Sequence, residues 1–349
     1  MKGKILIAAG GSGGHLIPAQ QLAELLEKKH QCQVLFAGYK LSSSPFFQQK
    51  RFSFREIPSA PISFAFFKAF WKGFWKSVWM LWKEKPHVVV GFGSYHTVPV
   101  LLAAVLFRKK IILYEANRVM GKVNWLISLF AEKVAGQFPP VGNPSKKWVS
   151  IPLFPWIPQT AHRLTKEAAR REFGLDPART TLLVFGGSQG AAFLNEKIPH
   201  AIKDLASIQV IHLTGSETSA REVRKQYSEW GIPAAVKAYE HQMQHAYDAA
   251  DLAICRSGAG TTAELIRYQI PSILIPFPHA ADDHQRHNAE YLQGLGCAVL
   301  LPQKKATAKA ITERIANADI HGMKLSLQLC SEPNEPRVDF DTLITRMLP

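Results

Sequence analysis

Short apolar runs alternate along this chain with longer stretches of amphipathic or polar sequence. In the first half the runs cover residues 4–9, 33–37, 88–91, 111–114 and 133–137. In the second half they cover residues 181–185, 209–213, 234–238, 252–255, 272–275 and 298–301. Apolar runs of this length, separated by helical patterns, are typical of strands buried on both faces of a parallel sheet. The pattern therefore predicts the α/β class.

The same plan occurs twice. In each half the first strand is followed by a loop that reads Gly-Gly-Ser-x-Gly, at Gly10–Gly14 and at Gly186–Gly190. We expect a helix from Pro18 to about Lys29 after the first loop, and another through Asn195 after the second. Because such loops lie at the carboxyl ends of open sheets, the repeat predicts two Rossmann-like domains that face a cleft.

A proline-rich stretch at 139–158 separates the two halves. We therefore expect an N-terminal domain over residues 1–155 and a C-terminal domain over residues 156–330. The tail, residues 331–349, lacks a clear period, and we expect it to form a loop and a short helix that returns to the N-terminal domain.

A turn at Arg256–Gly260 interrupts an apolar strand and leads at once into a helical pattern that includes Glu264. A helix entered through small residues directs unpaired N–H groups and the positive end of its dipole at the turn, so the turn suits a phosphate or pyrophosphate. A carboxylate one turn further on can accept hydrogen bonds from the vicinal hydroxyls of a ribose. The alternative is an ordinary strand–helix turn followed by a polar surface loop.

Neither glycine loop carries a dinucleotide fingerprint. Leu16 stands where Gly-x-Gly-x-x-Gly needs its third glycine, the second loop has a different spacing, and no acidic residue closes the second strand of either half. The Gly-Lys-Ser or Gly-Lys-Thr of a Walker loop does not occur. These observations argue against a nicotinamide or flavin enzyme and against a P-loop protein.

Composition adds an asymmetry of charge. The 349 residues are 47% hydrophobic and 20% charged, which is enough for two domains with full cores. Residues 1–150 contain 21 Lys and Arg, 6 Glu and no Asp, so this half alone carries the net charge of +15 of the whole chain. One half is therefore expected to face an anionic surface, and the other is not.

The four cysteines form no Cys-x-x-Cys pair and have no histidine at ligand spacing, which predicts reduced, cytosolic thiols. The apolar segment at residues 5–9 is too short for a signal peptide, and the run at 98–107 is about half of a bilayer span. Any membrane contact is therefore expected from one side.

The segment 64–85 combines aromatic and basic residues at helical spacing. Three lysines recur every fourth residue and share one flank of the helix, and six aromatic residues cover much of the rest: Lys68, Lys72 and Lys76, with Phe67, Phe70, Trp71, Phe74, Trp75 and Trp82. Trp and Lys together favour the headgroup level of a membrane, and each lysine near an anionic leaflet adds about 1 kcal/mol. The alternative is a purely structural helix.

Four motifs together resemble the MurG family in order and spacing. They are Gly10–His15, Gly186–Ala191, Arg256–Ala259 with Glu264, and His284-Gln285 with Asn288-Ala289. Members of the family transfer N-acetylglucosamine from UDP-N-acetylglucosamine to the muramyl sugar of lipid I, an undecaprenyl-pyrophosphoryl muramyl peptide, with inversion of the anomeric centre. The resemblance implies the glycosyltransferase-B fold, donor binding mainly by the C-terminal domain, and no metal or other cofactor.

The resemblance also implies a place in the cell. It indicates a peripheral enzyme of peptidoglycan synthesis that makes lipid II on the cytoplasmic face of the bacterial inner membrane. The implied partners are UDP-N-acetylglucosamine, the undecaprenyl-linked acceptor, an anionic membrane surface and cell-wall synthesis proteins. Nucleic acid is not among them.

Matching residue by residue divides the motifs between two substrates. The implied donor residues are Ser12, Gly13, Gly14, Asn117, Ser188, Ala259, Gly260, Thr261, Thr262, Ala263, Glu264, His284 and Gln285. The implied acceptor residues are Gly93, Ser94, Tyr95 and Glu115. The chain reads Tyr114-Glu115-Ala116-Asn117 where the family usually has His-Glu-Gln-Asn, and the arginine that the family places between the domains has no assigned match.

His15 is the candidate catalytic base. Displacing UDP from an anomeric carbon passes through an oxocarbenium-like state, and the attacking hydroxyl must lose its proton. His15 follows the first glycine loop at a helix start, where the helix dipole disfavours imidazolium. The alternative is that His15 only caps or orients the loop.

Two other functions use the same motifs. A UDP-N-acetylglucosamine 2-epimerase has this fold and donor but no lipid acceptor, so it has no use for the aromatic and basic helix. A peripheral membrane protein that binds nucleotide sugar without catalysis is the second. A nucleic-acid-binding protein would explain the charge, but not a helical stripe of tryptophans beside paired glycine loops.

Overall fold

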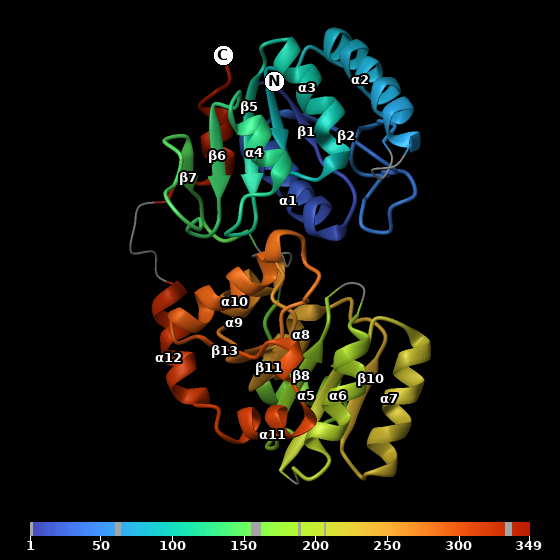
Figure 1. The fold of residues 1–349 in the computed structure, drawn as a ribbon, viewed down its shortest axis with the longest axis vertical. Helices are drawn as coiled ribbons and strands as arrows, with labels where there is room; N and C mark the ends of the chain where they lie inside the picture. Colours follow the sequence, from blue (N-terminus) through green and yellow to red (C-terminus); the bar gives the residue numbers. More distant parts are fainter. Residues whose placement is uncertain (1–2, 60–63, 155–161, 188–189, 206, 332–336) are drawn as a thin grey trace. The chain divides into compact units, whose positions relative to one another are not determined.

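The computed structural model describes residues 3–59, 64–154, 162–187, 190–205, 207–331 and 337–349. Contacts divide the chain into two compact units (Figure 1). Unit 1 comprises Met1–Trp156 with Glu335–Pro349, and unit 2 comprises Ile157–Asn334. Each unit is an α/β fold built on one parallel sheet, as the alternating apolar runs predicted.

Unit 1 contains a seven-stranded sheet in the order β3-β2-β1-β4-β5-β6-β7. Its strands are β1 (Lys4–Ala8), β2 (Gln33–Gly38), β3 (Phe54–Glu56), β4 (Val88–Gly91), β5 (Lys110–Glu115), β6 (Lys133–Gly136) and β7 (Trp148–Ser150). Its helices are α1 (Gly13–His30), α2 (Phe64–Glu84), α3 (Val98–Leu106), α4 (Lys122–Ser128) and α13 (Phe340–Thr345), with a 3₁₀ turn η1 at Tyr95–Thr97.

Unit 2 contains a six-stranded sheet in the order β10-β9-β8-β11-β12-β13. Its strands are β8 (Thr180–Phe185), β9 (Ile208–Leu213), β10 (Ala234–Lys237), β11 (Leu252–Cys255), β12 (Ser272–Leu274) and β13 (Ala298–Leu300). Its helices are α5 (Lys166–Glu172), α6 (Ala192–Ile202), α7 (Glu217–Glu229), α8 (Met243–Ala249), α9 (Ala259–Tyr268), α10 (His284–Gly294), α11 (Ala308–Ala316) and α12 (Ile320–Ser331), with 3₁₀ turns η2 (Ala281–Asp283) and η3 (Gln303–Lys305).

Both faces of the unit 1 sheet are buried. Ile5 and Ile7 of β1 belong to one core cluster, which includes residues of α1 and α13, and Leu6 and Ala8 belong to the opposite one, which includes residues of α2, α3 and α4. Successive strand residues point to opposite faces, so a strand with helices on both sides is apolar at nearly every position. This explains why the strands read as continuous apolar runs.

The first helix begins earlier than the sequence suggested. We expected it at Pro18, but α1 starts at Gly13, directly after the extended N-cap residue Ser12, and Pro18 lies inside it. As the sixth residue of α1, Pro18 lacks the N–H that would bond the carbonyl of Gly14, and the helix continues past this single missing bond. The consequence is that His15 belongs to the first turn of α1.

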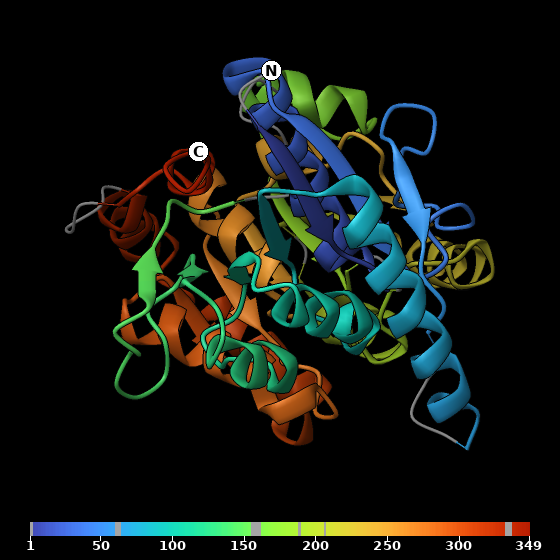
Figure 2. The same cartoon turned by 90° about the horizontal axis from the view of Figure 1, so that it is seen from above.

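Helix α2 covers Phe64–Glu84, close to the predicted 64–85, and lies alongside α3 (Figures 1 and 2). Gly73 faces the preceding segment so closely that a Cβ there would lie 2.2 Å from the carbonyl oxygen of Pro58. Met80 and Leu81 are fully buried, and Phe74 and Val78 pack partly against the same core cluster. One side of α2 is therefore fixed to the domain.

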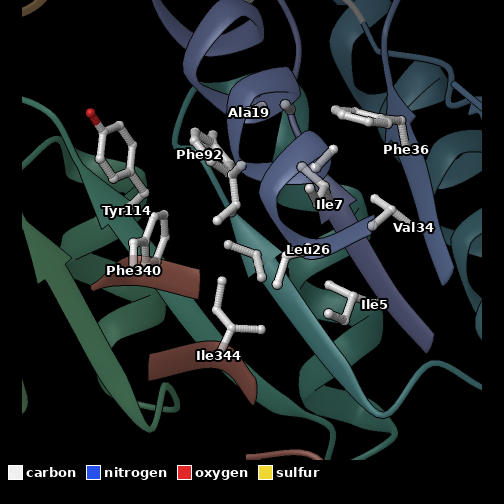
Figure 3. Packing of buried hydrophobic residues seen from close by; sticks show 14 of the residues in the cluster. Ile5, Ile7, Ala19, Leu26, Val34, Phe36, Phe92, Tyr114, Phe340 and Ile344 are labelled. Carbon is white, nitrogen blue, oxygen red and sulfur yellow. The ribbon is translucent and has the colours of Figure 1, made fainter. Parts of the chain in front are cut away.

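The C-terminal helix α13 completes the core of unit 1. Phe340 stacks on Tyr114 with ring centroids 5.6 Å apart and also meets Phe92, and Ile344 lies beside them (Figure 3). Asp341 accepts a hydrogen bond from Lys29 and pairs with His30 at 2.7 Å, which ties α13 to the end of α1.

Truncating Phe340 should therefore destabilise unit 1. We expect Phe340→Ala to lower the free energy of unfolding by about 3–5 kcal/mol, because it removes a buried aromatic ring. Urea unfolding followed by tryptophan fluorescence measures this, since seven of the eight tryptophans lie within residues 1–156. The exposed Leu106→Ala is the control, expected within about 0.5 kcal/mol of wild type. A loss below about 1 kcal/mol for Phe340→Ala would contradict the packing of α13.

Candidate active site

In unit 1 the glycine loop after β1 meets the loop after β4, which contains Gly93, where the strand order reverses. That reversal lies between β1 and β4, and the crevice beside such a switch point is where open parallel sheets bind ligands. The loop after β1 and the loop after β4 are in contact, because a Cβ on Gly11 would lie 3.4 Å from both His96 Cδ2 and Ser94 Oγ. Ser12, Gly13 and the implied acceptor residues 93–95 thus share one edge of the sheet.

His15 lies half-buried beside this edge. Its Nδ1 lies 3.3 Å from Ser12 Oγ, and its backbone N–H donates to the carbonyl of Ser12. The side chain of Ser12 makes no capping hydrogen bond to the helix, so the start of α1 remains open to a ligand. The ring is thus oriented by its own loop, with Nδ1 turned toward Ser12.

The loop after β4 contains a side chain that the sequence analysis missed. His96 is buried, stacks on Tyr39 with centroids 4.7 Å apart, and hydrogen-bonds through Nδ1 to Ser59 Oγ at 3.0 Å. Burial, aided by Lys40, lowers the pKa of His96 and so favours its neutral form. The sequence signal was its position directly after Gly93–Tyr95, but nothing in the sequence linked it to Tyr39.

Glu115, expected to contact an acceptor, is buried within its own loop. Its carboxylate accepts hydrogen bonds from the backbone N–H of Asn117 and Gly121 and from Asn124 Nδ2, at 2.9–3.1 Å. Burial raises the pKa of Glu115, and these three donors oppose the shift. Through them Glu115 fixes the loop that carries Asn117 at the end of β5.

In unit 2 the strand order reverses between β8 and β11, and the loops after β11 and β12 are joined there. Ser257 Oγ donates to the carbonyl of Gln285 at 2.7 Å, and Asn288 Nδ2 donates to the carbonyl of Ser257 at 3.0 Å. The side-chain oxygen of Gln285 accepts from the backbone N–H of Phe277 at 3.0 Å. Gln285 and Asn288 therefore hold the turn in place.

Helix α9 begins at this turn with an open N-terminus. Gly258 is its extended N-cap and provides no side chain to cap it, so the N–H groups of the implied donor residues Ala259, Gly260 and Thr261 point toward the turn. Thr262 and Ala263 are buried on the inner side of the helix. This is the arrangement that the sequence predicted for a pyrophosphate, and it supplies positive charge without a metal.

Glu264 has a partner that the sequence did not reveal. The residue is only 6% exposed, and its Oε2 accepts a hydrogen bond of 2.8 Å from the hydroxyl of Tyr247. Tyr247 is itself buried, stacked on Tyr268 and edge-on to Phe185. Because the aromatic rings fix Tyr247, the tyrosine fixes the orientation of the carboxylate.

The glycine loop after β8 is only partly described. The implied donor residue Ser188 lies outside the described residues, but the glycines on either side of it are described. Gly190 has φ +70°, and a Cβ there would lie 2.2 Å from the carbonyl oxygen of Thr214. Only glycine fits so close to the neighbouring strand end.

The polar segment before α10 shows no sign of a metal site. In the part of the chain that the structure describes, no three His, Cys, Asp or Glu side chains are grouped closely enough to hold a metal ion. His284 Nδ1 lies 2.7 Å from the carbonyl of Ala281, so its ring belongs to the local turn. Asp283 forms an ion pair with Arg286, with 3.7 Å between Asp283 Oδ2 and Arg286 Nη1.

Helices α2 and α4 present exposed aromatic and apolar side chains. Trp71, Trp75 and Trp79 on α2 are 53%, 62% and 54% exposed, and Trp125 on α4 is 63% exposed. Phe67, Trp82 and Leu126 are also exposed, as are Leu129 and Phe130 directly after α4. Lys68, Lys72 and Lys76 of α2 are exposed too. Phe70 and Phe74 are half-buried, so they do not belong to the fully exposed set, whereas Trp79 does and was missed.

No helix within the described ranges is both long enough and apolar enough to span a bilayer.

Family models and known proteins match this chain over most of its length. The model for the glycosyltransferase family 28 N-terminal domain matches residues 5–136, and that for the family 28 C-terminal domain matches residues 181–330. A UDP-N-acetylglucosamine--N-acetylmuramyl-(pentapeptide) pyrophosphoryl-undecaprenol N-acetylglucosamine transferase from Protochlamydia amoebophila is 40% identical over 313 residues, 83% of this chain and 80% of that protein. The protein of the same name from Polynucleobacter asymbioticus is 35% identical over 95% of both chains.

Solved structures agree. The crystal structure of Acinetobacter baumannii MurG superposes with a TM-score of 0.78 and 25% identity, covering 100% of this chain and 99% of that one. A structure from Listeria monocytogenes assigned as a UDP-N-acetylglucosamine 2-epimerase gives a TM-score of 0.64 at 11% identity, covering 93% and 91%. At that identity the similarity shows a shared fold only.

Two parallel sheets with open loops at their switch points, and a family 28 match in each unit, define a glycosyltransferase of the B fold. The similar proteins identify the family within this class of glycosyltransferases. With 40% identity over 83% of its length to one of them, the chain belongs to the MurG family.

The strained residue of the β4 loop offers a test of the site's geometry. Ser94 has φ +71° and ψ 140°, a conformation that suits glycine. Ser94→Gly should therefore raise the free energy of unfolding by about 1 kcal/mol, because relief of strain exceeds the entropy that glycine adds to the unfolded chain. Ser53→Gly, at a position without positive φ, should lower it by about 0.5–1 kcal/mol in the same urea titration. Equal losses from both variants would contradict the strained loop.

Proposed function

We propose that this protein transfers N-acetylglucosamine from UDP-N-acetylglucosamine to the muramyl sugar of lipid I, forming lipid II in peptidoglycan synthesis. The observation that carries this is the 40% identity over 83% of the chain to an enzyme of that name, combined with glycine loops at both switch points. The epimerase is not favoured, because the similarity to it is one of fold.

An assay of UDP-N-acetylglucosamine with and without a polyprenyl-linked muramyl acceptor tests the function directly. We expect a disaccharide-linked lipid and free UDP only when the acceptor is present. Epimerisation of the sugar without acceptor, or binding without turnover, would overturn the proposal.

We assign donor binding mainly to unit 2. The open N-terminus of α9 suits the pyrophosphate, since unpaired N–H groups and the helix dipole stabilise the charge that builds up on departing UDP. Glu264 suits the ribose, because a carboxylate held by Tyr247 accepts hydrogen bonds from two vicinal hydroxyls without first being ordered. Gln285 and Asn288 maintain the turn in which these groups lie.

We assign the base to His15. The acceptor hydroxyl attacks the anomeric carbon as the bond to UDP breaks, the bonding electrons leave with the diphosphate, and the hydroxyl proton passes to the imidazole. Attack from the face opposite UDP inverts the anomeric centre. Because His15 Nδ1 faces Ser12 Oγ, we assign Nε2 as the atom that accepts the proton from the attacking hydroxyl.

We assign membrane docking to the exposed aromatic side chains of α2 and α4, with the lysines of α2 beside them. Amphipathic surfaces with Trp and Lys insert to the headgroup level, and the net +15 of residues 1–150 attracts anionic lipid. A lipid-linked acceptor cannot leave the bilayer, so the enzyme has to come to it. The cytoplasmic face of the inner membrane is the side where a nucleotide sugar is available.

Loss of the base should affect turnover and spare donor binding. We expect His15→Ala to lower kcat by about 10²- to 10⁴-fold, the range for losing a general base, with UDP affinity retained. The control is His321→Ala, an exposed histidine on α12 that should leave both quantities unchanged. Near-normal turnover in His15→Ala would refute the assignment.

The Tyr247–Glu264 pair should govern UDP affinity. Glu264→Gln should weaken UDP binding by about 1.5–3 kcal/mol, the scale of a charge-assisted hydrogen bond. Tyr247→Phe should weaken it about tenfold, because the carboxylate loses its anchor. Isothermal calorimetry measures both, and Tyr227→Phe is the matched control: its buried hydroxyl bonds His212 at 2.9 Å, so its loss should change stability but not UDP affinity. If Glu264→Gln binds UDP as tightly as wild type does, Glu264 does not bind the ribose.

Membrane binding should have a salt-resistant and a salt-sensitive part. Replacing Trp71, Trp75 and Trp79 with Ser should abolish the salt-resistant part and leave UDP affinity unchanged. Replacing Lys68, Lys72 and Lys76 with Gln should remove the preference for anionic vesicles, because exposed charges are screened within about 8 Å at physiological salt. Sedimentation with neutral and anionic vesicles separates the two.

The control for these variants is Leu329→Ser, which removes a 70% exposed apolar side chain from unit 2. It should bind vesicles as wild type does. If the tryptophan variant also binds normally, the membrane contact lies elsewhere on the basic unit.

A further inference from the structure

Two thiols far apart in sequence lie together in unit 2. The Sγ atoms of Cys297 and Cys330 are 3.2 Å apart. Cys297 is buried between the end of α10 and the start of β13, and Cys330 is the penultimate residue of α12 and half-exposed. Both are free thiols. Sequence spacing gave no indication of the pair.

The surroundings hold the two thiols in place. The turn before Cys297 contains Gly296 with φ +70°, where a Cβ would lie 3.1 Å from Ser326 Oγ, so α12 packs directly on this turn. Leu327 is fully buried and anchors the same helix. A disulfide needs a sulfur separation of about 2.05 Å, so the two atoms have only about 1.2 Å left to close.

We propose that Cys297 and Cys330 form an oxidant-responsive disulfide site. A hydroperoxide oxidises the half-exposed Cys330 thiol to a sulfenic acid and is reduced to water or an alcohol. Cys297 sulfur then attacks the sulfenic sulfur, the S–S bond forms, and the hydroxyl leaves as water with the thiol proton of Cys297. Cys330 is the first target because it is half-exposed, whereas Cys297 is buried and burial raises the pKa of its thiol, which disfavours direct oxidation by peroxide.

The disulfide would link α12, the last helix of unit 2, covalently to the rest of that unit. It closes a loop between residues 33 apart in sequence and joins the C-terminal end of α12 to the turn that follows α10. It would also protect Cys330, because a sulfenic acid captured by a neighbouring thiol does not advance to sulfinic acid. The donor residues of α10 lie at the opposite end of that helix, so UDP affinity should be unaffected.

Mass spectrometry of the native protein exposed to hydrogen peroxide tests the proposal. We expect a loss of two hydrogens, a crosslinked peptide pair containing Cys297 and Cys330, and full reversal by dithiothreitol. The crosslink should raise the melting temperature of unit 2 by roughly 5–10 °C, the scale for closing a loop of this length. Four thiols that stay free after peroxide treatment, or a crosslink that forms only in urea, would overturn the proposal.

Variants separate the two roles. In Cys297→Ala, Cys330 should gain two oxygen atoms as sulfinic acid and should be trapped earlier by dimedone. In Cys330→Ala, Cys297 should resist peroxide, which keeps the test open if the first variant fails to fold. Cys32→Ala is the matched control, since it removes another buried thiol and should leave the crosslink intact. Sulfinic acid forming on Cys330 as fast in wild type as in Cys297→Ala would show that the thiols do not cooperate.

Discussion

Burial of both faces of a parallel sheet is the constraint on which the rest of this structure depends. Ile5 and Ile7 pack on one side of β1 while Leu6 and Ala8 pack on the other, so the interior strand positions are mostly apolar. The polar exceptions in unit 2, such as Gln209 and His212 on β9, are buried with hydrogen-bond partners. Polar chemistry is displaced to the edge where the strands end. Where the strand order reverses, the loops that follow the two neighbouring strands lead away in opposite directions and leave a crevice. The glycine turns and the open helix N-termini lie at these points.

This constraint explains what the sequence could reveal. Continuous apolar runs locate the strands, because burial on two faces leaves no alternation, and glycine loops that follow them locate the site. The class and the two sheets were predictable for this reason. The helix at Phe64–Glu84 was predictable from a different signal, the helical spacing of its lysines and aromatic residues. The edge strands β3 and β7 were not, because Phe54–Glu56 and Trp148–Ser150 include polar residues and form no continuous apolar run. The start of α1 was misplaced because Pro18 looked like a boundary and is tolerated within the helix.

Contacts between distant residues were beyond the sequence. Tyr247 lies on α8 and anchors Glu264 on α9, and His96 in the loop after β4 stacks on Tyr39 in the loop after β2. Each pair joins side chains whose spacing in the chain has no period, so only the folded sheet brings them together. Glu115 has local partners: its carboxylate accepts hydrogen bonds from Asn117, Gly121 and Asn124, and its contact with the acceptor stays a prediction.

The packing of α13 against unit 1 has a consequence for folding during synthesis on the ribosome. A chain emerges from its N-terminus, and domains generally fold as they appear. Here the N-terminal unit is missing Phe340 and Ile344 until these residues have been made, while unit 2 lies wholly within the chain already synthesised. The unit translated first is therefore the last to complete its core. A chain that stops before residue 340 would have an intact unit 2 and an incomplete core in unit 1.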